Sequence, residues 1–556
     1  MTDTATMRQS TGMSKRQLSP APLPVAKRPH ISAPVTSGSS RERPSLDTLL
    51  YDEVLLLIFS YLSWADLCAI QATNRNWCRL SLDNQLWKSL YLSEYGRTRL
   101  RGVRGFIARP DGREIRPLPG RTNFEDVRDW KWMFRISSNW RIGKCSVDSL
   151  TPPSSPLLLP RSLPAQTNEP RPETLLLLAG NIIITASSRP SSSPEIRFTT
   201  SGAVHTMHCP SSKGTNPTEV TALALDQSPP TNAHHIRLVS FLSTGEFTVF
   251  LVNHQTVSNS TRLMSWVPVS RTPRTSPIIQ AVYHHPVLIT LSESFYLSLY
   301  DLSSNNIVHA QTLSSFTSFP PSSLVLSSTS PGMYKLVLAY AIPVYPSHWS
   351  VGATELIISS SPSLGVTASR TTKAFDVPPG WIDEHKMKAA REQWGRKVAR
   401  VADTQTDGKW VVLAPGEPVK PTSTPIGPGS AASGYPSSSL HSPSSLQLYR
   451  LHLPSSTSSS SLPKLNFVRT LHGQTGSVSA LALADGRCVS LGVNGSIWAW
   501  DLEGGTGAEV SGARPVDLDE LESLDVHPLV KGAVVFDERQ IISADSRGVE
   551  VRRFDI

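Results

Sequence analysis

A strand–turn–strand pattern recurs four times along the chain, and this recurrence constrains the fold more than any other feature. The four segments align without gaps and begin at Arg237, Val287, Arg487 and Gln540. In three of them a glycine follows an aliphatic residue by six positions; the residues in this slot are Gly245, Gly495 and Gly548, with Phe295 in the fourth segment. Each segment predicts two strands joined by a tight turn that contains a residue with positive φ. Such repeats are typical of arrays in which each unit packs against the next.

One repeat, Leu471 to Asp501, is more complete than the others. It has a loop at Gly473, an apolar strand from Val478 to Leu483, and a closing Trp500-Asp501 pair. This pattern resembles a WD repeat, and the resemblance implies a β-propeller. Further candidate blades lie at 174–198, 324–358 and 410–451. We expect seven blades, because the strand after the preceding linker then pairs with the C-terminal repeat and closes the ring without an exposed sheet edge.

The densest apolar run in the first third of the chain lies between Pro44 and Tyr91. Its apolar residues recur at helical spacing and predict three short helices, the first with a stripe formed by Leu50, Val54, Ile58 and Leu62, and with Leu55 and Phe59 beside it. Ser63 with Asp66 resembles a capping box, and Asp83 is a further candidate cap. A unit of about fifty residues is marginal alone. Its wide apolar stripe therefore suggests a docking face.

This stretch resembles the F-box family through Leu50, Asp52, Glu53, Leu55, Ile58 to Leu62, Asp66, Leu67, Asn74 to Leu80, Asp83, Leu86, Trp87 and Tyr91. Two positions depart from the family pattern: Tyr51 stands where the family usually has proline, and Leu57 where it often has an acid. The resemblance implies binding to the small adaptor of SCF cullin-RING ubiquitin ligases and, through it, to the cullin and RING subunits. We expect the adaptor-binding residues to be Leu50, Tyr51, Leu55, Ile58, Phe59, Leu62, Leu67, Trp77, Leu86 and Trp87.

A second helix-favouring segment runs from Phe124 to Cys145, with aromatic and aliphatic residues at helical spacing. It ends in the motif Asn139-Trp140-Arg141-x-Gly143. The motif resembles the end of the helical linker that joins an F-box to a WD-repeat propeller. The resemblance implies that these four residues form the joint between the two domains, and an ordinary amphipathic helix is the alternative.

Changes in composition along the chain predict several domains, with α-helical domains followed by an all-β domain. Residues 1–42 are rich in Ser, Thr and Pro and are predicted to be disordered. We expect the F-box at 43–95, a connector and helical linker at 96–145, a Ser/Pro linker at 146–170, and the propeller at 171–556. Ser/Pro-rich insertions at about 252–276, 415–444 and 453–462 are interpreted as disordered surface loops. Residues 381–402 favour a helix with six basic and three acidic residues, either solvated or docking a partner.

Two short motifs bear on location and turnover. Lys15-Arg16 and Lys27-Arg28 are ten residues apart, a spacing that resembles a bipartite nuclear import signal, with solvated tail charge as the alternative. Thr151 precedes Pro152, and Ser155 follows four residues later, as in a phosphodegron. We hypothesise that phosphorylation there controls turnover, against the alternative of a plain Ser/Pro linker. No signal peptide or membrane-spanning segment is evident, so we expect the nucleus, the cytoplasm or both.

Charge and motif content narrow the possible functions. The net charge is +9, but residues 1–150 hold 23 basic and 14 acidic residues, which leaves 30 of each beyond. A neutral C-terminal part without an aromatic-basic platform disfavours nucleic acid as a partner. The five scattered cysteines predict neither a zinc site nor a disulfide framework. No phosphate-binding or nucleophile motif is evident, so we expect no cofactor, no metal and no catalytic residues.

The sequence therefore predicts a non-catalytic, substrate-recognition subunit of an SCF-type ubiquitin ligase. Its F-box is expected to bind the adaptor and its propeller a target protein, with phosphorylation of that target left open, so that the target is ubiquitinated and degraded. Two alternatives remain: a scaffold built from F-box and propeller that acts without the cullin, and a chromatin-associated interaction platform.

Overall fold

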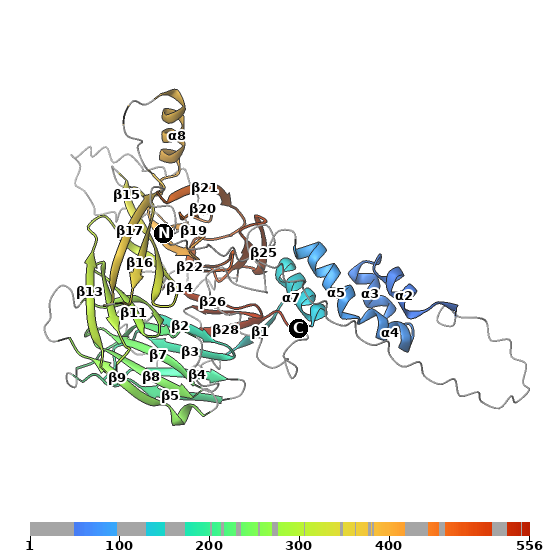
Figure 1. Cartoon of the computed structure of the whole chain (residues 1–556), viewed down its shortest axis with the longest axis horizontal. Helices are drawn as coiled ribbons and strands as arrows, with labels where there is room; N and C mark the ends of the chain where they lie inside the picture. Colours follow the sequence, from blue (N-terminus) through green and yellow to red (C-terminus); the bar gives the residue numbers. More distant parts are fainter. Residues whose placement is uncertain are drawn as a thin grey trace, which may run out of the picture.

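The computed structural model of the chain describes a group of N-terminal helices followed by a ring of β-sheets (Figure 1). The described residues are 49–96, 129–150, 173–200, 203–212, 216–228, 235–253, 256–268, 276–304, 306–344, 348–361, 363–375, 380, 383–417, 443–454, 462–513, 531–545 and 548–556. The predicted tail at 1–42, the import-like motif, Thr151 and the greater part of 415–444 and of 453–462 lie outside them.

Four helices, rather than the three expected, form the described part of the F-box: α2 (Asp52–Phe59), α3 (Trp64–Ile70), α4 (Arg75–Ser81) and α5 (Asn84–Tyr91). A short π-helical turn, η1 (Leu92–Gly96), follows. Both predicted caps are present, since Ser63 accepts the backbone N–H of Asp66, and Asp83 accepts those of Gln85 and Leu86. The capping box is confirmed only for its serine half, because the Asp66 carboxylate accepts the Ser63 hydroxyl. The missed helix start is Asn74, whose side chain accepts the N–H of Trp77 at 2.8 Å. It divides a run that apolar spacing alone presents as continuous.

The strands of the described part form seven four-stranded antiparallel sheets, as expected for a seven-bladed propeller. Blades 1 to 3 are β2 (Thr174–Ala179), β3 (Ile182–Ser187), β4 (Glu195–Thr200), β5 (Ala203–His208); β6 (Val220–Leu225), β7 (His235–Leu242), β8 (Phe247–Asn253), β9 (Thr261–Trp266); and β10 (Ile278–His284), β11 (Val287–Ser292), β12 (Tyr296–Asp301), β13 (Val308–Ser314). Blade 4 comprises β14 (Phe319–Ser330), β15 (Met333–Val344), β16 (His348–Ser359) and β17 (Gly365–Lys373).

Blades 5 and 6 are β18 (Val401–Thr406), β19 (Trp410–Pro415), β20 (Leu446–His452), β21 (Lys464–Leu471); and β22 (Val478–Ala484), β23 (Arg487–Gly492), β24 (Ile497–Asp501), β25 (Thr506–Ser511). Blade 7 combines β26 (Ala533–Phe536), β27 (Gln540–Asp545) and β28 (Gly548–Arg553) with β1 (Ser146–Ser149). The predicted closure is confirmed, because β1 pairs with β28 in register Ser146 to Arg553. The ring therefore starts inside the range expected to be a Ser/Pro linker.

The turn slot of the repeats has the predicted backbone conformation in all four segments. Gly245, Gly495 and Gly548 have φ of 80°, 76° and 132°, and Phe295 has φ of 60°. The Phe295 side chain is buried, with its ring centroid 5.7 Å from that of Tyr340 in blade 4. Packing therefore holds a side chain in a conformation that ordinarily favours glycine.

One predicted loop was wrong. The range 252–276 contains a short 3-10 turn, Val257–Asn259, and strand β9, which is the outer strand of blade 2. Its residues, TRLMSW, are largely exposed on one side, so their polar composition reflects an edge position rather than a loop. In contrast, the helix expected within 381–402 is present as α8 (Glu384–Gly395).

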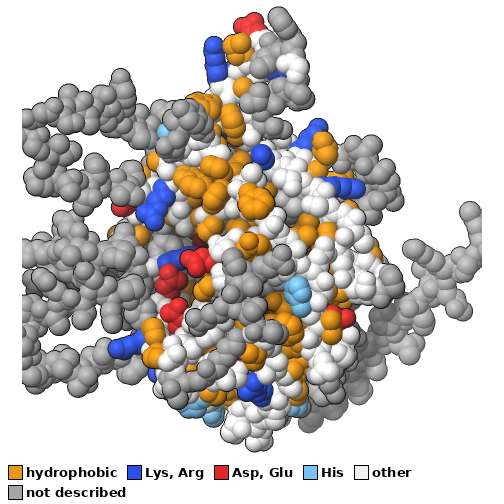
Figure 2. Space-filling view, turned by 90° about the vertical axis from the view of Figure 1, so that its left-hand side faces the viewer, with side chains coloured by type: hydrophobic (Ala, Val, Ile, Leu, Met, Phe, Trp, Pro, Cys, Tyr) orange, Lys and Arg blue, Asp and Glu red, His pale blue; other side chains and the backbone are white. Residues whose placement is uncertain are grey.

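The ring has two faces at opposite ends of its strands. The linker face carries the turns that follow the first strand of each blade, such as Glu538–Arg539 between β26 and β27, and the linker helix contacts it there. The far face carries the repeat turns at Gly245 and Gly495 and the connections between blades. In Figure 1 the F-box lies on the right, so the view in Figure 2 looks onto the side of the ring turned away from it.

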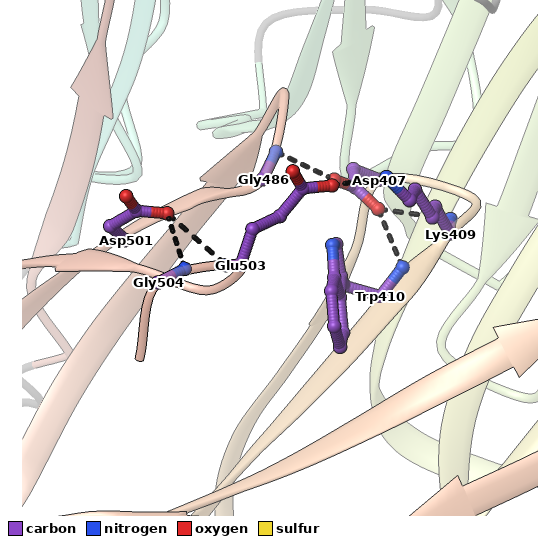
Figure 3. A network of polar contacts seen from close by, with 7 residues as sticks. All are labelled: Asp407, Lys409, Trp410, Gly486, Asp501, Glu503 and Gly504. Carbon is purple, nitrogen blue, oxygen red and sulfur yellow. Dashed lines mark hydrogen bonds and ion pairs between the residues drawn. The ribbon is translucent and has the colours of Figure 1, made fainter. Parts of the chain in front are cut away.

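Partly buried aspartates accept backbone N–H groups in turns on the linker face, and one of them also joins two blades. Asp407, in the turn between β18 and β19, accepts backbone N–H groups of Lys409 and Trp410 at 2.9 and 2.7 Å and that of Gly486 in blade 6 at 3.0 Å (Figure 3). Burial raises the pKa of Asp407 above its usual range although these hydrogen bonds favour the charged form. Asp537 occupies the equivalent turn of blade 7, and burial raises its pKa to about 6.

We predict that Asp407→Ala lowers the free energy of unfolding by about 3 kcal/mol, because three donors lose their acceptor. Asp407→Asn keeps an acceptor oxygen without a buried charge and should lose about 1 kcal/mol or less. Asp501→Ala is the control, since Asp501 accepts the N–H groups of Glu503 and Gly504 within its own turn (Figure 3). Denaturant unfolding at pH 7 measures all three, and equal losses for Asp407→Ala and Asp501→Ala would refute a role for the hydrogen bond from Asp407 to blade 6.

Candidate functional site

The outer side of α2 and the start of α3 present large apolar side chains to solvent. Leu57 is 58% and Ile58 46% exposed, and Tyr51, Val54, Tyr61 and Trp64 are exposed as well. We call these six residues the F-box face. Contiguous apolar surface of this kind marks an interaction site in a folded protein, because burial against a partner releases the water that covers it.

The ten residues predicted to bind the adaptor divide into three groups in the structure. Tyr51 and Ile58 are exposed, whereas Leu50, Leu62 and Trp77 are partly buried. The other five lie in the helical core: Leu55, Phe59, Leu67, Leu86 and Trp87. These five can support the F-box face from behind but do not present atoms to a partner in this conformation. For the other five residues, which are exposed or partly buried, the assignment as adaptor contacts stays a prediction.

Sequence reasoning left out four members of the F-box face: Val54, Leu57, Tyr61 and Trp64. Val54 and Tyr61 stand at i−4 and i+3 from Ile58, which was selected, and Leu57 stands at i+3 from Val54 and i−4 from Tyr61, so all three follow helical spacing. The apolar stripe alone does not say which of two adjacent sides of α2 is buried. The structure decides it, because Leu55 and Phe59 point to the core and Phe59 packs edge-on against Trp77 with ring centroids 5.7 Å apart.

The F-box core continues directly into the linker helix α7 (Trp130–Ile142). The side chain of Asn84, at the start of α5, accepts the backbone N–H of Trp130 at 3.0 Å. Ring centroids of Trp87 and Phe134 lie 5.6 Å apart, and those of Tyr91 and Trp130 lie 5.5 Å apart. Aromatic pairs in this geometry add to the free energy gained by burying their area. The two units therefore share one packed interior.

At its other end α7 is attached to blade 7 by two residues of the predicted motif. The side-chain amide of Asn139 donates to the carbonyl of Phe554 at 2.8 Å. The Trp140 indole N–H donates to the carbonyl of Glu538 at 2.9 Å, and its ring stacks on Phe554 at 4.2 Å. The guanidinium of Arg487, from blade 6, lies 4.9 Å from the Trp140 ring centroid. One side chain thus contacts two blades of the ring.

The other two motif residues have different tasks. Arg141 pairs with Glu94 of η1, so it fastens the helix to the F-box side rather than to the ring. Both side chains are at least half exposed, so this ion pair adds little stability. Gly143 ends α7 in the left-handed conformation, with φ of 72°, and a Cβ there would collide with the backbone carbonyl of Glu509 in blade 6. Gly143 is therefore required both for the turn and for the close approach of α7 to the ring.

We predict that Gly143→Ala lowers the Tm more than an alanine substitution at a glycine that has positive φ but no close neighbour. Gly408 provides the matched control, since its φ is 85° but a Cβ would meet only a Val337 methyl at 3.9 Å. Gly408→Ala should cost about 1 kcal/mol, whereas Gly143→Ala must also displace the backbone of blade 6. Thermal unfolding of the full chain tests the difference, and similar shifts in Tm would contradict the close contact.

The described residues contain no group of three or more His, Cys, Asp or Glu placed to hold a metal ion. Within the same part of the chain, none of the helices has both the length and the apolar character needed to cross a membrane. Cys209 and Cys488 are buried, and burial raises the pKa of the Cys209 thiol to about 11. A thiol with so high a pKa is a poor nucleophile at neutral pH.

Comparison with known proteins agrees with this architecture. A family model described as F-box-like matches residues 52–93, and one described as F-box protein pof12 beta-propeller matches residues 164–552. No curated protein matches the chain.

The chain is also similar to several solved structures, at low identity and TM-score. They include the Myceliophteria thermophila Cps50 (Swd1) β-propeller domain, at 10% identity and a TM-score of 0.38, with 69% of this chain and 97% of that chain covered. The C-terminal WD40 domain of Sif2 has 12% identity and a TM-score of 0.34, with 69% and 82% covered. Saccharomyces cerevisiae Sqt1 has 9% identity and a TM-score of 0.36, with 67% and 92% covered.

The predicted architecture is thereby confirmed as an F-box followed by a seven-bladed propeller. An F-box implies binding to an SCF adaptor of the Skp1 type. The propeller model spans more than half of the sequence. The chain belongs to the F-box protein pof12 beta-propeller family.

Proposed function

We propose that this protein is the substrate-recognition subunit of an SCF-type ubiquitin ligase. The observation that carries the proposal is the F-box face, an uncovered apolar surface on a helical unit whose other side is packed into the linker helix. In this role the F-box binds the adaptor, the adaptor brings the cullin and RING subunits, and the propeller holds a target protein. The chain contributes no catalytic group, and the ubiquitin-charged enzyme modifies the captured target.

In the proposed mechanism the chain acts by holding the target at a fixed position relative to the ligase. One continuous apolar cluster includes Leu55 of α2, Trp140 of α7 and Phe554 at the end of blade 7, so the described F-box and ring are packed together. A target held on the ring then lies at a fixed distance and orientation from the bound ligase scaffold. Such placement converts a bimolecular encounter into a local one and raises the effective concentration of the target's lysines.

Tyr51 bears on adaptor affinity, because it replaces the proline usual in the family. Its backbone has φ of −72° and ψ of 154°, and these angles are those that proline adopts readily. The substitution therefore leaves the start of α2 in a proline-compatible conformation. The Tyr51 ring is 81% exposed and adds apolar area to the F-box face instead of the pyrrolidine ring. The exposed ring supports binding of the adaptor at Tyr51.

We predict that Leu57→Asp/Ile58→Asp weakens adaptor binding at least 100-fold, because two carboxylates would be desolvated in an apolar contact. Both side chains are about half exposed, so the fold should be retained. The matched control is Val204→Asp/Val308→Asp, which adds the same charges to exposed outer strands of blades 1 and 3. Isothermal titration with the purified adaptor measures affinity, and thermal unfolding checks the fold.

Unchanged adaptor affinity in the F-box variant would contradict the proposed interface. Binding of the adaptor without recruitment of the cullin would instead favour the scaffold alternative. We propose the nucleus, the cytoplasm or both as the location, on the basis of the basic pairs at Lys15-Arg16 and Lys27-Arg28. Replacing these four residues by alanine in a fluorescently tagged chain tests that part of the proposal by its distribution.

A further inference from the structure

Helix α8 stands out from the ring between blades 4 and 5 (Figure 1). It is twelve residues long, its N-cap Asp383 accepts the backbone N–H of Lys386 at 2.8 Å, and none of its residues is buried. An isolated helix of this length is marginal in water, and most short helices are stabilised by packing one face against a neighbour. α8 has such a face, and the described residues cover it only in part.

The base of α8 is nonetheless firmly attached. After the helix, Val398 forms two backbone hydrogen bonds with Trp349 of β16, at 2.7 and 2.9 Å. The carbonyl of Arg396 accepts the side-chain amide of Gln447 at 2.8 Å, and the Trp394 ring packs edge-on against Phe375 at 5.4 Å. Strands β15 and β16 in blade 4 are twelve residues each and support this attachment. The exposed helix is therefore held at a fixed place on the ring.

The partly covered face of α8 combines apolar and basic groups. Met387, Ala390 and Trp394 follow helical spacing on one side, and Met387 is 45% and Trp394 38% exposed. The surrounding cations are Lys386, Lys388, Arg391, Arg396, Lys397 and Arg400. Together these nine residues form what we call the α8 surface. Figure 2 shows blue and orange side chains on the projecting helix and further orange side chains on the face beneath it.

Five of the six cations of this surface form no ion pair with another described residue, although α8 also carries Glu384 and Glu392. None of the ion pairs between described residues includes Lys388, Arg391, Arg396, Lys397 or Arg400. Two of the cations lie on aromatic rings instead, Lys397 4.2 Å from the Trp394 centroid and Arg396 4.6 Å from that of Phe467. Cations held in this way remain able to pair with carboxylates of a partner.

The α8 surface lies at the end of the strands away from the F-box. β18 begins at Val401, just after α8, and ends at the turn that carries Asp407 on the linker face. Since α7 contacts the equivalent turn of blade 7 at Glu538, the base of α8 and the linker helix lie at opposite ends of the strands, and α8 projects from the rim of the ring (Figure 1). A protein bound to α8 would leave the F-box face accessible.

We propose that the α8 surface binds an acidic, amphipathic helical segment of a partner protein, without any need for phosphorylation. Leucine-like side chains of that segment would cover Met387 and Trp394, and its carboxylates would pair with Lys388, Arg391 and the neighbouring cations. A helix laid along a helix buries such spaced apolar residues, as in other helix-recognition modes. Nucleic acid is disfavoured, because its phosphates would leave the apolar stripe uncovered and the aromatic face of Trp394 is already occupied by Lys397.

The bound partner would be a ligase target only if the proposed function holds, and in this respect the inference rests on it. Binding of the partner to α8 does not require the adaptor. The probe is a fluorescein-labelled peptide of two Glu-Glu-Leu-Leu-Glu-Asp-Leu repeats, titrated with the full chain and followed by fluorescence anisotropy. A scrambled peptide of equal composition without a leucine stripe and a 14-nucleotide single-stranded DNA serve as comparison ligands. We expect the repeat peptide to bind at least tenfold more tightly than either, and more weakly as salt is raised.

Two sets of variants separate charge from apolar contact. Lys388→Glu/Arg391→Glu should weaken binding at least tenfold, and Met387→Ala/Trp394→Ala should do the same. The control Arg262→Glu/Lys464→Glu changes two exposed cations on the outer strands of blades 2 and 5 and should change affinity less than twofold. All variants should bind the adaptor like the parent chain, so failure here is distinguishable from failure of the ligase proposal.

Three results would overturn the inference. The first is equal binding of the repeat and scrambled peptides. The second is tighter binding of the DNA, with loss of that binding in the Lys388→Glu/Arg391→Glu variant. The third concerns residues 516–525 of this chain, which include five acids and three leucines. If the peptide binds only after Asp517, Asp519, Glu520, Glu522 and Asp525 are replaced by their amides, this segment, and not a partner, is the occupant.

Discussion

The stacking of Trp140 on Phe554 is the contact on which the rest of the structure depends. The indole lies where the linker helix, blade 6 and blade 7 meet, and its N–H is satisfied by a backbone carbonyl of the ring. Through this side chain the helical core of the F-box and the β-sheet core of the propeller become one apolar cluster. A protein whose two domains were connected only by a chain segment would not fix the direction of one relative to the other.

The ring closes although its repeats differ in sequence, because a few local interactions recur where the sequence does not. Asp226, Asp407 and Asp537 follow the first strands of blades 2, 5 and 7, and each accepts backbone N–H groups of its own turn. Asp226 and Asp407 also accept one from the next blade, at His285 and Gly486. Two of these carboxylates therefore join neighbouring blades without the Trp-Asp pair by which such repeats are usually detected.

Periodic features of the sequence predicted the ring and its closure, since strand alternation and a positive-φ slot every repeat are local properties. The orientation of side chains was harder to predict. Spacing placed Leu55, Phe59 and Ile58 on neighbouring stripes of one helix, but only the packing of α4 against α2 determines that the first two are buried and the third is exposed. The outer strand β9 was missed because an edge strand with one solvated side has the composition of a loop. The split at Asn74 was missed because its neighbours maintain an apolar spacing across the break.

The pairing of β1 with β28 has a consequence for synthesis. The four residues that complete blade 7 follow α7 almost directly, whereas their partner strand, β28, belongs to the last blade of the ring in chain order. As the chain leaves the ribosome, the F-box helices are complete long before Phe554 and Glu538 exist, so Trp140 has no place to pack until blade 7 emerges. A chain that ended a blade early would therefore leave the aromatic side of α7 uncovered and blade 1 without its neighbour, a form that chaperones and proteases recognise by its exposed apolar surface.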